Sequence, residues 1–361
     1  MIRIDVLLQT MKYGLILFFF LLSFSIFAQD SSAVFEKKMM RYRDFPRDTI
    51  WPKYSNDYYD NYSNQLGLFL SGKYKTTNIL IKDRLTDKQL DYSPKNQLYL
   101  GPGFTYKMIG NGLSASFGFL NRDQGGEPTK RTDLYVNLML KRFIFDFSYR
   151  YYKNFTLKNS SDYFVGDQPY VRPDIQTIYL GMGAVYVLSY KKFSYRAAFT
   201  QTAIQKKSAG SFMFGTQIYL QGLQGDSSIF PQSAGLPDVT GRASLYVGLT
   251  TAYAYNFIIK KHYFMALSLA TAIEFGKVVT VLNHAERYTN HTPSMHFQPR
   301  VVAGINKPKW YLGMSIVGDY FMQTFVPDDA RFEFRIRSGN IRFFVGRRFN
   351  WLSRKQLDKK L

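Results

Sequence analysis

The amino-acid sequence predicts an all-β protein, a transmembrane antiparallel up-and-down β-barrel. Three observations support this prediction: long segments of alternating apolar and polar side chains, an unusual aromatic content, and an apolar leader. Aromatic residues make up 17% of the 361 residues, yet the mean hydropathy is only -0.22. A helical membrane protein is much more apolar, because each of its spans needs ~20 nearly continuous apolar residues. A barrel with a lipid-facing exterior and a wet interior combines these two properties.

Residues 1–28 have the parts of a secretory signal peptide. Arg3 and Lys12 supply positive charge, residues 14–27 form an apolar run, and Ala28 is small enough for a cleavage site. An uncleaved anchor is the alternative, although the run is short for a bilayer span. No later stretch approaches ~20 apolar residues, so any insertion into a membrane must use strands that close into a barrel.

Alternation is the strongest signal for strands, because successive side chains of a strand point to opposite faces. In residues 243–257 the odd positions carry mostly large apolar or aromatic side chains such as Leu249 and Phe257. The even positions carry mostly small or polar ones such as Ser244, and residues 262–276 repeat the pattern. Many of these segments reach the ~9–11 residues that a tilted strand needs to cross a bilayer. Strands of soluble β-sandwiches are usually shorter, ~5–6 residues.

The assigned segments are odd in number, whereas single-chain bacterial barrels normally have an even number of strands. We therefore expect about fourteen strands, with about twelve as the alternative. The uncertainty lies between residues 204 and 242, where a short strand lies within 224–241 or two assigned strands are one. Residues 331–349 could also be two strands. The segments are 66–81, 97–109, 112–121, 131–141, 143–153, 174–189, 192–203, 211–220, 243–258, 262–276, 296–306, 309–324 and 331–349.

The lengths of the connections predict the two sides of the membrane. Short turns, such as 260–261 and 306–309, should be periplasmic. This arrangement predicts the outer membrane of a Gram-negative bacterium, where lipids and lipopolysaccharide are the immediate partners. The longer connections, which should be extracellular, are 82–96, 122–130, 154–173 and 277–295.

The barrel is expected to span residues 66–351. Residues 29–65 precede it and contain Trp51 and several tyrosines without clear periodicity. They form either a periplasmic leader or a segment folded into the lumen. Residues 352–361 form a polar C-terminal tail.

The net charge of +21 predicts anionic partners. Nucleic acid is a poor candidate, because the basic residues are dispersed and no recognised nucleic-acid motif occurs. Charges lie mostly on the strand face opposite the apolar one, where basic rings in a pore favour anionic solutes. Alternatively, these residues pair with Asp146, Asp319, Glu274 and Glu333 inside a plugged barrel. The candidate basic cluster of the lumen is Lys141, Arg150, Arg196, Arg331, Arg335, Arg337 and Arg342.

The predicted barrel and its charges leave three hypotheses for function. The first is a pore or transport barrel with a basic interior, and the second is a non-conducting structural or accessory barrel of a surface or secretion complex. The third is a lipid-modifying barrel enzyme, which needs a nucleophile, a base and an orienting acid in contact. His262 and Glu274 share one strand face but are ~40 Å apart at ~3.3 Å per residue, so they cannot be partners. We therefore expect no catalytic residues.

The sequence predicts no metal or cofactor site. The absence of cysteine excludes disulfides, cysteine-ligated metals and thiol catalysis. A histidine-rich extracellular loop could bind a divalent metal, but its spacing does not place the side chains together on one strand face. Of the four histidines, His284, His291 and His296 lie within residues 284–296 beside Glu286, and His262 lies elsewhere.

Several stretches carry a resemblance to a known family. Residues 194–199 and 205–212 are the most specific, and residues 172–175, 67–74 and 92–94 are similar as well. Together they resemble a family of outer-membrane β-barrels of uncharacterised function over roughly Asp48 to Phe349. The resemblance implies a location and a fold, but no activity or catalytic residues.

Overall fold

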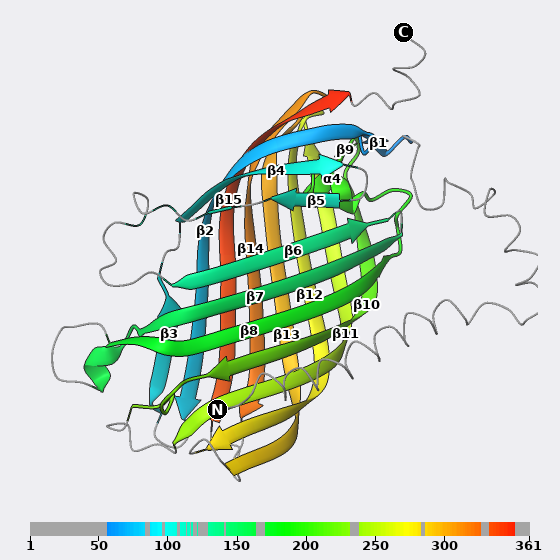
Figure 1. The fold of residues 1–361 in the computed structure, drawn as a ribbon. Coiled ribbons are helices and arrows are strands. Elements are labelled where there is room, and N and C mark those ends of the chain that lie inside the picture. Colours follow the sequence, from blue (N-terminus) through cyan, green and yellow to red (C-terminus); the bar gives the residue numbers. More distant parts are fainter. Residues whose placement is uncertain are drawn as a thin grey trace, which may run out of the picture. The chain divides into compact units, whose positions relative to one another are not determined.

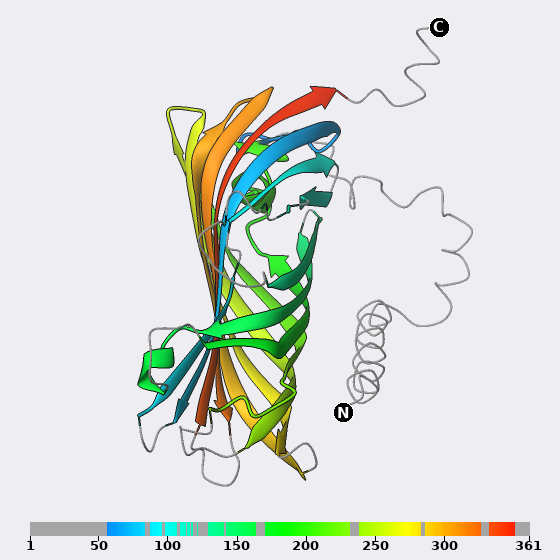
Figure 2. The same cartoon turned by 60° about the vertical axis from the view of Figure 1, so that its left-hand side comes forward.

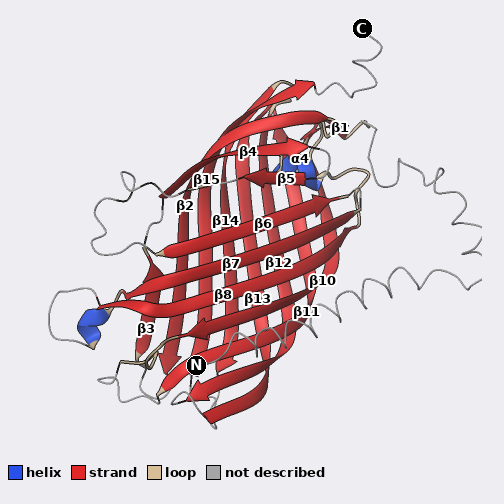
Figure 3. Ribbon diagram, in the orientation of Figure 1, coloured by secondary structure: helices blue, strands red, loops and turns tan. Residues whose placement is uncertain are grey.

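The chain forms one large antiparallel sheet that closes on itself in the computed structural model (Figures 1 and 3). The predicted signal peptide, most of residues 29–65 and the predicted tail lie outside the described residues. The structure describes residues 56–83, 87–95, 98–106, 109–112, 114–115, 117, 121, 129–140, 142–163, 170–231, 238–282, 286–325 and 332–350.

Long strands build most of the wall. None of the helices in the described part of the chain is long and apolar enough to cross a bilayer. The long strands are β2 (Gln65–Asp83), β7 (Phe143–Leu157), β8 (Tyr170–Val187), β10 (Ala209–Gln224), β11 (Val239–Ile259), β12 (Tyr263–Leu282), β13 (Glu286–Asn306), β14 (Trp310–Phe325) and β15 (Phe332–Asn350). The shorter elements are β1 (Tyr59–Asn61), β3 (Gln89–Pro94), β4 (Leu98–Tyr106), β5 (Ile109–Gly112), β6 (Lys130–Met139), η3 (Ser160–Asp162), α4 (Tyr195–Phe199) and β9 (Ala203–Gln205).

The ring closes where β15 pairs with β2, and the wall has a fork on the other side of β2. At one end β3 joins β2 to β7 and completes a ring of 10 strands. Toward the other end β4, β5 and β6 follow one another between β2 and β7. The fork coincides with a register shift in β7 around Asn154, whose φ is 77°. The predicted antiparallel barrel, with about 12–14 strands in total, is confirmed.

The outer face of the sheet carries an apolar belt. Leu249 on β11 and Ile273 on β12 are paired across the two strands, and both side chains are 72% exposed. Phe275 and Phe343 are also strongly exposed. Large apolar side chains on the outside of a closed sheet are suited to lipid. The outer faces predicted for residues 243–257 and 262–276 agree with this arrangement.

The sheet extends beyond the thickness of a bilayer. Strands β11 and β13 each contain 21 residues, twice the ~9–11 needed for a crossing. The predicted loop 277–295 is therefore wrong, because β12 continues to Leu282 and β13 begins at Glu286. Outside the bilayer the outer face of a strand contacts water, so this face becomes polar and the segment resembles a loop in sequence.

The predicted strand 192–203 is also wrong. Strands β8 and β10 pair directly, starting from Val187 and Met213, and the residues between them leave the wall. Ser194 begins helix α4 and accepts a hydrogen bond from the Ala197 backbone N–H at 3.3 Å. Ala198 packs with apolar side chains of the inner wall. Figure 2 shows α4 within the ring.

Strand β1 pairs with β9 in register Tyr59↔Gln205. We call residues 56–63 and 192–206 together the plug. Tyr59 is buried, and its hydroxyl donates to the carbonyl oxygen of Tyr190 at 3.1 Å. The plug lies at the end of the barrel that carries the short turn 306–309, because Asn306 donates to the carbonyl oxygen of Ala203 at 3.0 Å.

Candidate functional site

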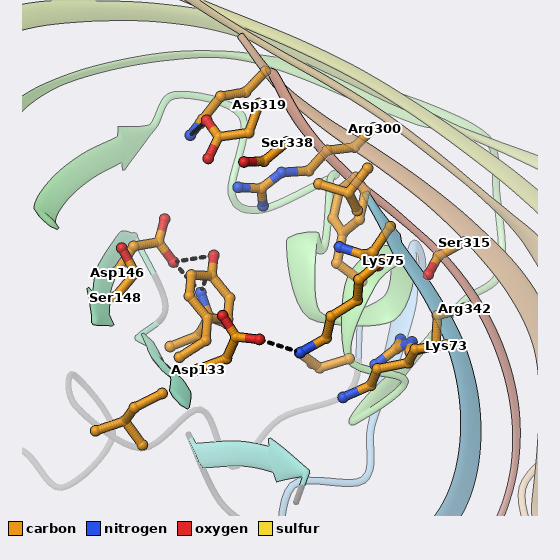
Figure 4. A pocket seen from close by; sticks show the side chains of 18 of the residues that line it. Lys73, Lys75, Asp133, Asp146, Ser148, Arg300, Ser315, Asp319, Ser338 and Arg342 are labelled. Atoms are coloured by element: carbon orange, nitrogen blue, oxygen red, sulfur yellow. Dashed lines mark hydrogen bonds and ion pairs between the residues drawn. The ribbon is translucent and has the colours of Figure 1, made fainter. Parts of the chain in front are cut away.

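The lumen contains a cavity of about 1190 Å³. Inward-facing side chains of β2, β6, β7, β13, β14 and β15 line it, together with Tyr195 and Phe199 of the plug. This volume lies just above the ~300–1,000 Å³ typical of ligand pockets. Figure 4 shows that the charged side chains around it come from well-separated strands.

The plug bounds the cavity on one side and is fastened to the wall by Arg348. The Arg348 guanidinium donates to the carbonyl oxygen of Gln201 at 3.1 Å from Nε and to Asn306 Oδ1 at 2.5 Å from Nη2. It also donates to the carbonyl oxygen of Lys307 and lies 5.1 Å from the ring centroid of Tyr62. Hydrogen bonds from a charged group are the stronger ones in proteins. Arg348 therefore holds both halves of the plug.

Within the plug, Arg196 is buried beside Tyr59. Its Nη2 donates to Asn61 Oδ1 at 3.4 Å. Burial lowers the pKa of Arg196 to about 10 and raises the pKa of Tyr59. Both shifts reflect the removal of ionisable groups from water.

A polar layer bounds the cavity on the opposite side, and its members come from opposite walls. Arg150 on β7 forms an ion pair with Asp319 on β14 at 2.7 Å. His296 Nε2 contacts the other Asp319 oxygen, and its Nδ1 lies 3.5 Å from Glu274 Oε1. The Tyr219 hydroxyl donates to Glu274 Oε2 at 2.5 Å. We call Arg150, Gln217, Tyr219, Glu274, His296 and Asp319 the cross-lumen layer.

Burial makes these contacts obligatory. Glu274 and His296 are each 2% exposed, and an unpaired charge at such a position is strongly destabilising. Gln217 contacts both residues and lies 2.8 Å from His296 Nδ1. Phe321 stacks on the His296 imidazole with ring centroids 3.8 Å apart. The layer is therefore both hydrogen-bonded and packed.

Beyond this layer the ring of ten strands is filled by apolar side chains. Ile79, Phe155 and Phe334 come from three different strands and belong to one buried cluster. The Tyr92 hydroxyl donates to the carbonyl oxygen of Ile229 at 2.6 Å within the same region. Side chains from opposite walls thus meet across the lumen at this end.

Between these two boundaries, one side of the cavity is strongly basic. Lys75 Nζ lies 2.5 Å from Asp133 Oδ2, and Arg131 Nε lies 3.1 Å from the same oxygen. Lys73 Nζ donates to Ser114 Oγ at 3.4 Å, its one hydrogen bond to a described residue. Figure 4 shows Lys73 and Arg342 side by side. We call Lys73, Lys75, Arg131 and Arg342 the cationic wall.

Arg342 is the least satisfied member of this wall. Its guanidinium lies 4.6 Å from the ring centroid of Phe344 and 5.9 Å from that of Phe69. Its buried Nε has no hydrogen-bond partner among the described residues. Within the described part of the chain, these four cations therefore share one carboxylate, Asp133, and the wall is suited to an anion.

The residues predicted for the basic cluster occupy several places. Arg150 and Arg342 face the lumen, and Arg196 belongs to the plug rather than to the wall. Arg335 and Arg337 were assigned to the lumen face, and this assignment is wrong. The remaining two, Lys141 and Arg331, lie outside the described residues.

The register of β15 explains the error. Ile336 pairs with Ile79, and both belong to or pack on the apolar cluster inside the ring. Arg335 and Arg337 consequently point outward, in phase with Phe343 on the lipid-facing belt. At this height the inner face is apolar and the outer face is charged, which reverses the order found within the bilayer.

The histidines are also placed differently from the prediction. The sequence places His296 at the start of the predicted strand 296–306, next to the histidine-rich loop, but it lies in the middle of β13 and faces the lumen. His291 stacks on Phe275 with ring centroids 6.4 Å apart, and His284 lies outside the described residues. Among the residues that the structure describes, no cluster of three potential ligands could hold a metal ion.

Several lumen residues were missed, although the sequence contains their signal. Lys73 and Lys75 alternate with Leu68, Leu70 and Tyr74, and thus lie on the polar face of the first predicted strand. The contact between Glu274 and His296 carries no such signal. It depends on the register between β12 and β13, which alternation does not determine.

Comparisons with known proteins give a family and a set of similar folds. The profile of the family described as "Domain of unknown function (DUF4421)" matches residues 46–349. No curated protein matches the chain. The outer membrane protease OmpT from Escherichia coli aligns with 82% of this chain and 99% of its own, at 8% identity and a TM-score of 0.38.

Two further solved structures are similar at the same low level. The Pseudomonas putida toluene transporter TodX covers 84% of this chain and 97% of its own, at 10% identity and a TM-score of 0.27. OmpT of Vibrio cholerae covers 77% of this chain and 98% of its own, at 8% identity and a TM-score of 0.29.

Proposed function

We propose that this chain, which belongs to the DUF4421 family of unknown function, is an outer-membrane transport barrel that binds an anionic solute in its lumen. One observation carries the proposal: Lys73, Lys75, Arg131 and Arg342 face a large cavity and share a single carboxylate, Asp133. A cavity lined by an excess of one charge concentrates solutes of the opposite charge. The apolar belt supports the placement in a membrane.

Transport by this barrel requires a movement rather than simple diffusion through an open pore. The plug and the cross-lumen layer lie on opposite sides of the cavity, and each is held by hydrogen bonds from arginine. We infer that the described conformation is a closed state. The solute would bind in the cavity, and displacement of the plug or of the layer would release it.

A non-conducting accessory barrel is the second candidate, and the cross-lumen layer is the observation that favours it. The ion pair between Arg150 and Asp319 ties opposite walls together, as expected of a structural barrel. A structural barrel has no need for the unsatisfied cations of the cationic wall. Binding of an anion at Lys73 and Arg342 therefore separates the two candidates.

A catalytic role is not proposed. His296 lies between Asp319 and Glu274, an arrangement that could serve a general base. However, both of its ring nitrogens have partners, and Phe321 covers one face of the ring. These contacts account for His296 as a structural member of the cross-lumen layer.

Equilibrium binding tests the proposal with two anionic probes, inorganic phosphate and dodecanoate, on the purified full barrel. The double variant Lys73→Gln with Arg342→Gln should weaken binding of at least one probe by about tenfold or more. The control, Arg335→Gln with Arg337→Gln, removes the same charge from the outer face and should bind as the wild type does. Equal binding of both probes by both double variants would overturn the proposal.

A further inference from the structure

The cavity is not confined to the inside of the ring. Gly101 and Thr105 of β4 face inward, whereas Leu100 and Phe104 face outward, and all four residues line the same cavity. Leu100 is 37% exposed and Phe104 is 45% exposed. A lumen sealed by a continuous wall could not contact both faces of one strand. The cavity therefore reaches the outer surface beside β4.

The pairing of the strands shows where the wall is incomplete. Strand β5 pairs with β6 only at Leu138 and Asn137. Residues 130–136 of β6 pair with β7 on one side and, among the described residues, have no ladder partner on the other. On the β4 side of the gap, Ala115 makes an isolated bridge to Leu100. We call this gap between the described residues of β4 and β6 the lateral opening.

The rim of the lateral opening is apolar. Leu134 of β6 is 47% exposed, and Phe117 on the opposite side is 41% exposed. Both residues line the cavity together with Leu100. Leu100 pairs with Gly72, which in turn pairs with Phe343, one of the most exposed side chains of the lipid-facing belt. The lateral opening thus lies at the height of the bilayer.

The inner end of the same opening is cationic. Ser114 lines the cavity near the rim, and its hydroxyl accepts the hydrogen bond from Lys73 Nζ. Lys75 and Arg342 follow from β2 and β15 (Figure 4). An apolar rim open to lipid therefore leads to a group of cations that outnumber the described carboxylates beside them. An apolar rim followed by a cationic wall is complementary to an amphiphile that has an apolar chain and an anionic headgroup.

We propose that the solute of this transport barrel is an anionic single-chain amphiphile, a carboxylate or phosphate monoester, that passes between the bilayer and the lumen through the lateral opening. The inference rests on the proposed function and deepens it. The headgroup is bound by Lys73 and Arg342, and the chain lies along Leu100, Phe117 and Leu134. The apolar chain of the amphiphile is equally at home in the bilayer, so it gives little preference for the barrel. The selectivity therefore comes from the binding of the anionic headgroup by the cationic wall.

The first experiment compares three probes on the full barrel in phosphatidylcholine vesicles. Dodecanoate has both the chain and the negative charge, inorganic phosphate has only the charge, and dodecyltrimethylammonium has the chain with the opposite charge. Dodecanoate should bind at least tenfold more tightly than either of the other two. The variant Lys73→Gln with Arg342→Gln should remove this preference.

The second experiment blocks the lateral opening. The chain has no cysteine, so Leu134→Cys introduces a single thiol that pyrene maleimide can modify. The control is Leu269→Cys, at a position 51% exposed on the outer face of β12 and absent from the cavity lining. Pyrene at position 134 should slow dodecanoate binding by about tenfold, and pyrene at position 269 should not. Retained resistance to unfolding in dodecyl sulfate at room temperature verifies that both variants are folded.

The outcomes separate the inference from the proposed function. If phosphate binding depends on Lys73 and Arg342 but dodecanoate has no advantage, the lateral route is wrong and the anion-transport proposal stands. The same conclusion follows if pyrene at position 134 leaves the rate unchanged. If neither anion depends on Lys73 and Arg342, both proposals fail.

Discussion

Arg150 on β7 and Asp319 on β14 form an ion pair of 2.7 Å across the lumen, although 169 residues separate them in sequence. The pair joins two walls that are not neighbours in the sheet. Asp319 also accepts a hydrogen bond from Gln298 Nε2 at 3.3 Å and contacts His296. One carboxylate therefore organises the cross-lumen layer, and four predictions concern this layer, the plug and the wall.

Replacement of Asp319 by alanine should destabilise the barrel strongly. It leaves Arg150 without its carboxylate and His296 with Glu274 alone, and breaking a buried ion pair costs ~3–5 kcal/mol. Urea unfolding in lipid vesicles measures the loss. The control is Asp87→Ala at the exposed pair between Lys82 and Asp87, where ~0–1 kcal/mol is expected. Equal losses in the two variants would contradict the role assigned to Asp319.

Replacement of Arg348 by alanine should loosen the plug. It removes the hydrogen bonds to Gln201, Asn306 and Lys307, and a hydrogen bond to a charged group is worth ~1.5–3 kcal/mol. We expect channel openings in planar bilayers and protease cleavage within residues 195–205. The neighbouring variant Arg347→Ala changes the outer face and should do neither. A closed, protease-resistant Arg348→Ala barrel would show that the plug is held by other contacts.

Replacement of Ile273 by arginine tests the lipid-facing belt. A charge at mid-bilayer should lower the free energy of unfolding by ~2–4 kcal/mol. Thr289 also points outward but lies on the part of β13 beyond the belt, so Thr289→Arg should cost ~0–1 kcal/mol. Refolding into vesicles and urea titration give both values. Similar costs at the two positions would place the membrane boundary elsewhere.

Replacement of Gly304 by alanine tests how closely β13 and β14 pack. An added Cβ would lie 2.2 Å from the carbonyl oxygen of Leu312, whereas at Gly72 it would meet nothing within 4 Å. We expect Gly304→Ala to destabilise the barrel by ~1–3 kcal/mol because backbone must move. Gly72→Ala should be neutral within about 1 kcal/mol. Thermal unfolding of both variants measures the difference. Equal decreases in melting temperature for Gly304→Ala and Gly72→Ala would refute the close packing of β13 and β14.

The barrel could be predicted from the sequence because alternation reports burial directly. Residues 243–257 show it most clearly, since each side chain faces either lipid or the lumen. The same logic fails at residues 192–203, where apolar and polar positions alternate in sequence but residues 195–199 form helix α4, whose consecutive residues Arg196, Ala197 and Ala198 are all buried. It also fails at residues 277–295, where strands leave the bilayer and lose their apolar face.

The candidate site could be predicted only in part. Arg150 and Arg342 follow from their place on the polar face of predicted strands. Asp319 is among the carboxylates expected to pair with them, but its pairing with Arg150 in particular does not follow from the sequence, because the height of β14 relative to β7 depends on the closure of the ring. Arg335 was misplaced for a related reason: the apolar cluster inside the ring reverses the usual order of the two faces at that height.

The pairing of β1 with β9 has a mechanical consequence. Three residue pairs, from Tyr59↔Gln205 to Asn61↔Ala203, join the two halves of the plug. A pull on Asn56 would be transmitted through this short ladder to β9 and would act on the bonds of Arg348 to Gln201. The two halves of the plug would therefore leave the wall together rather than one after the other.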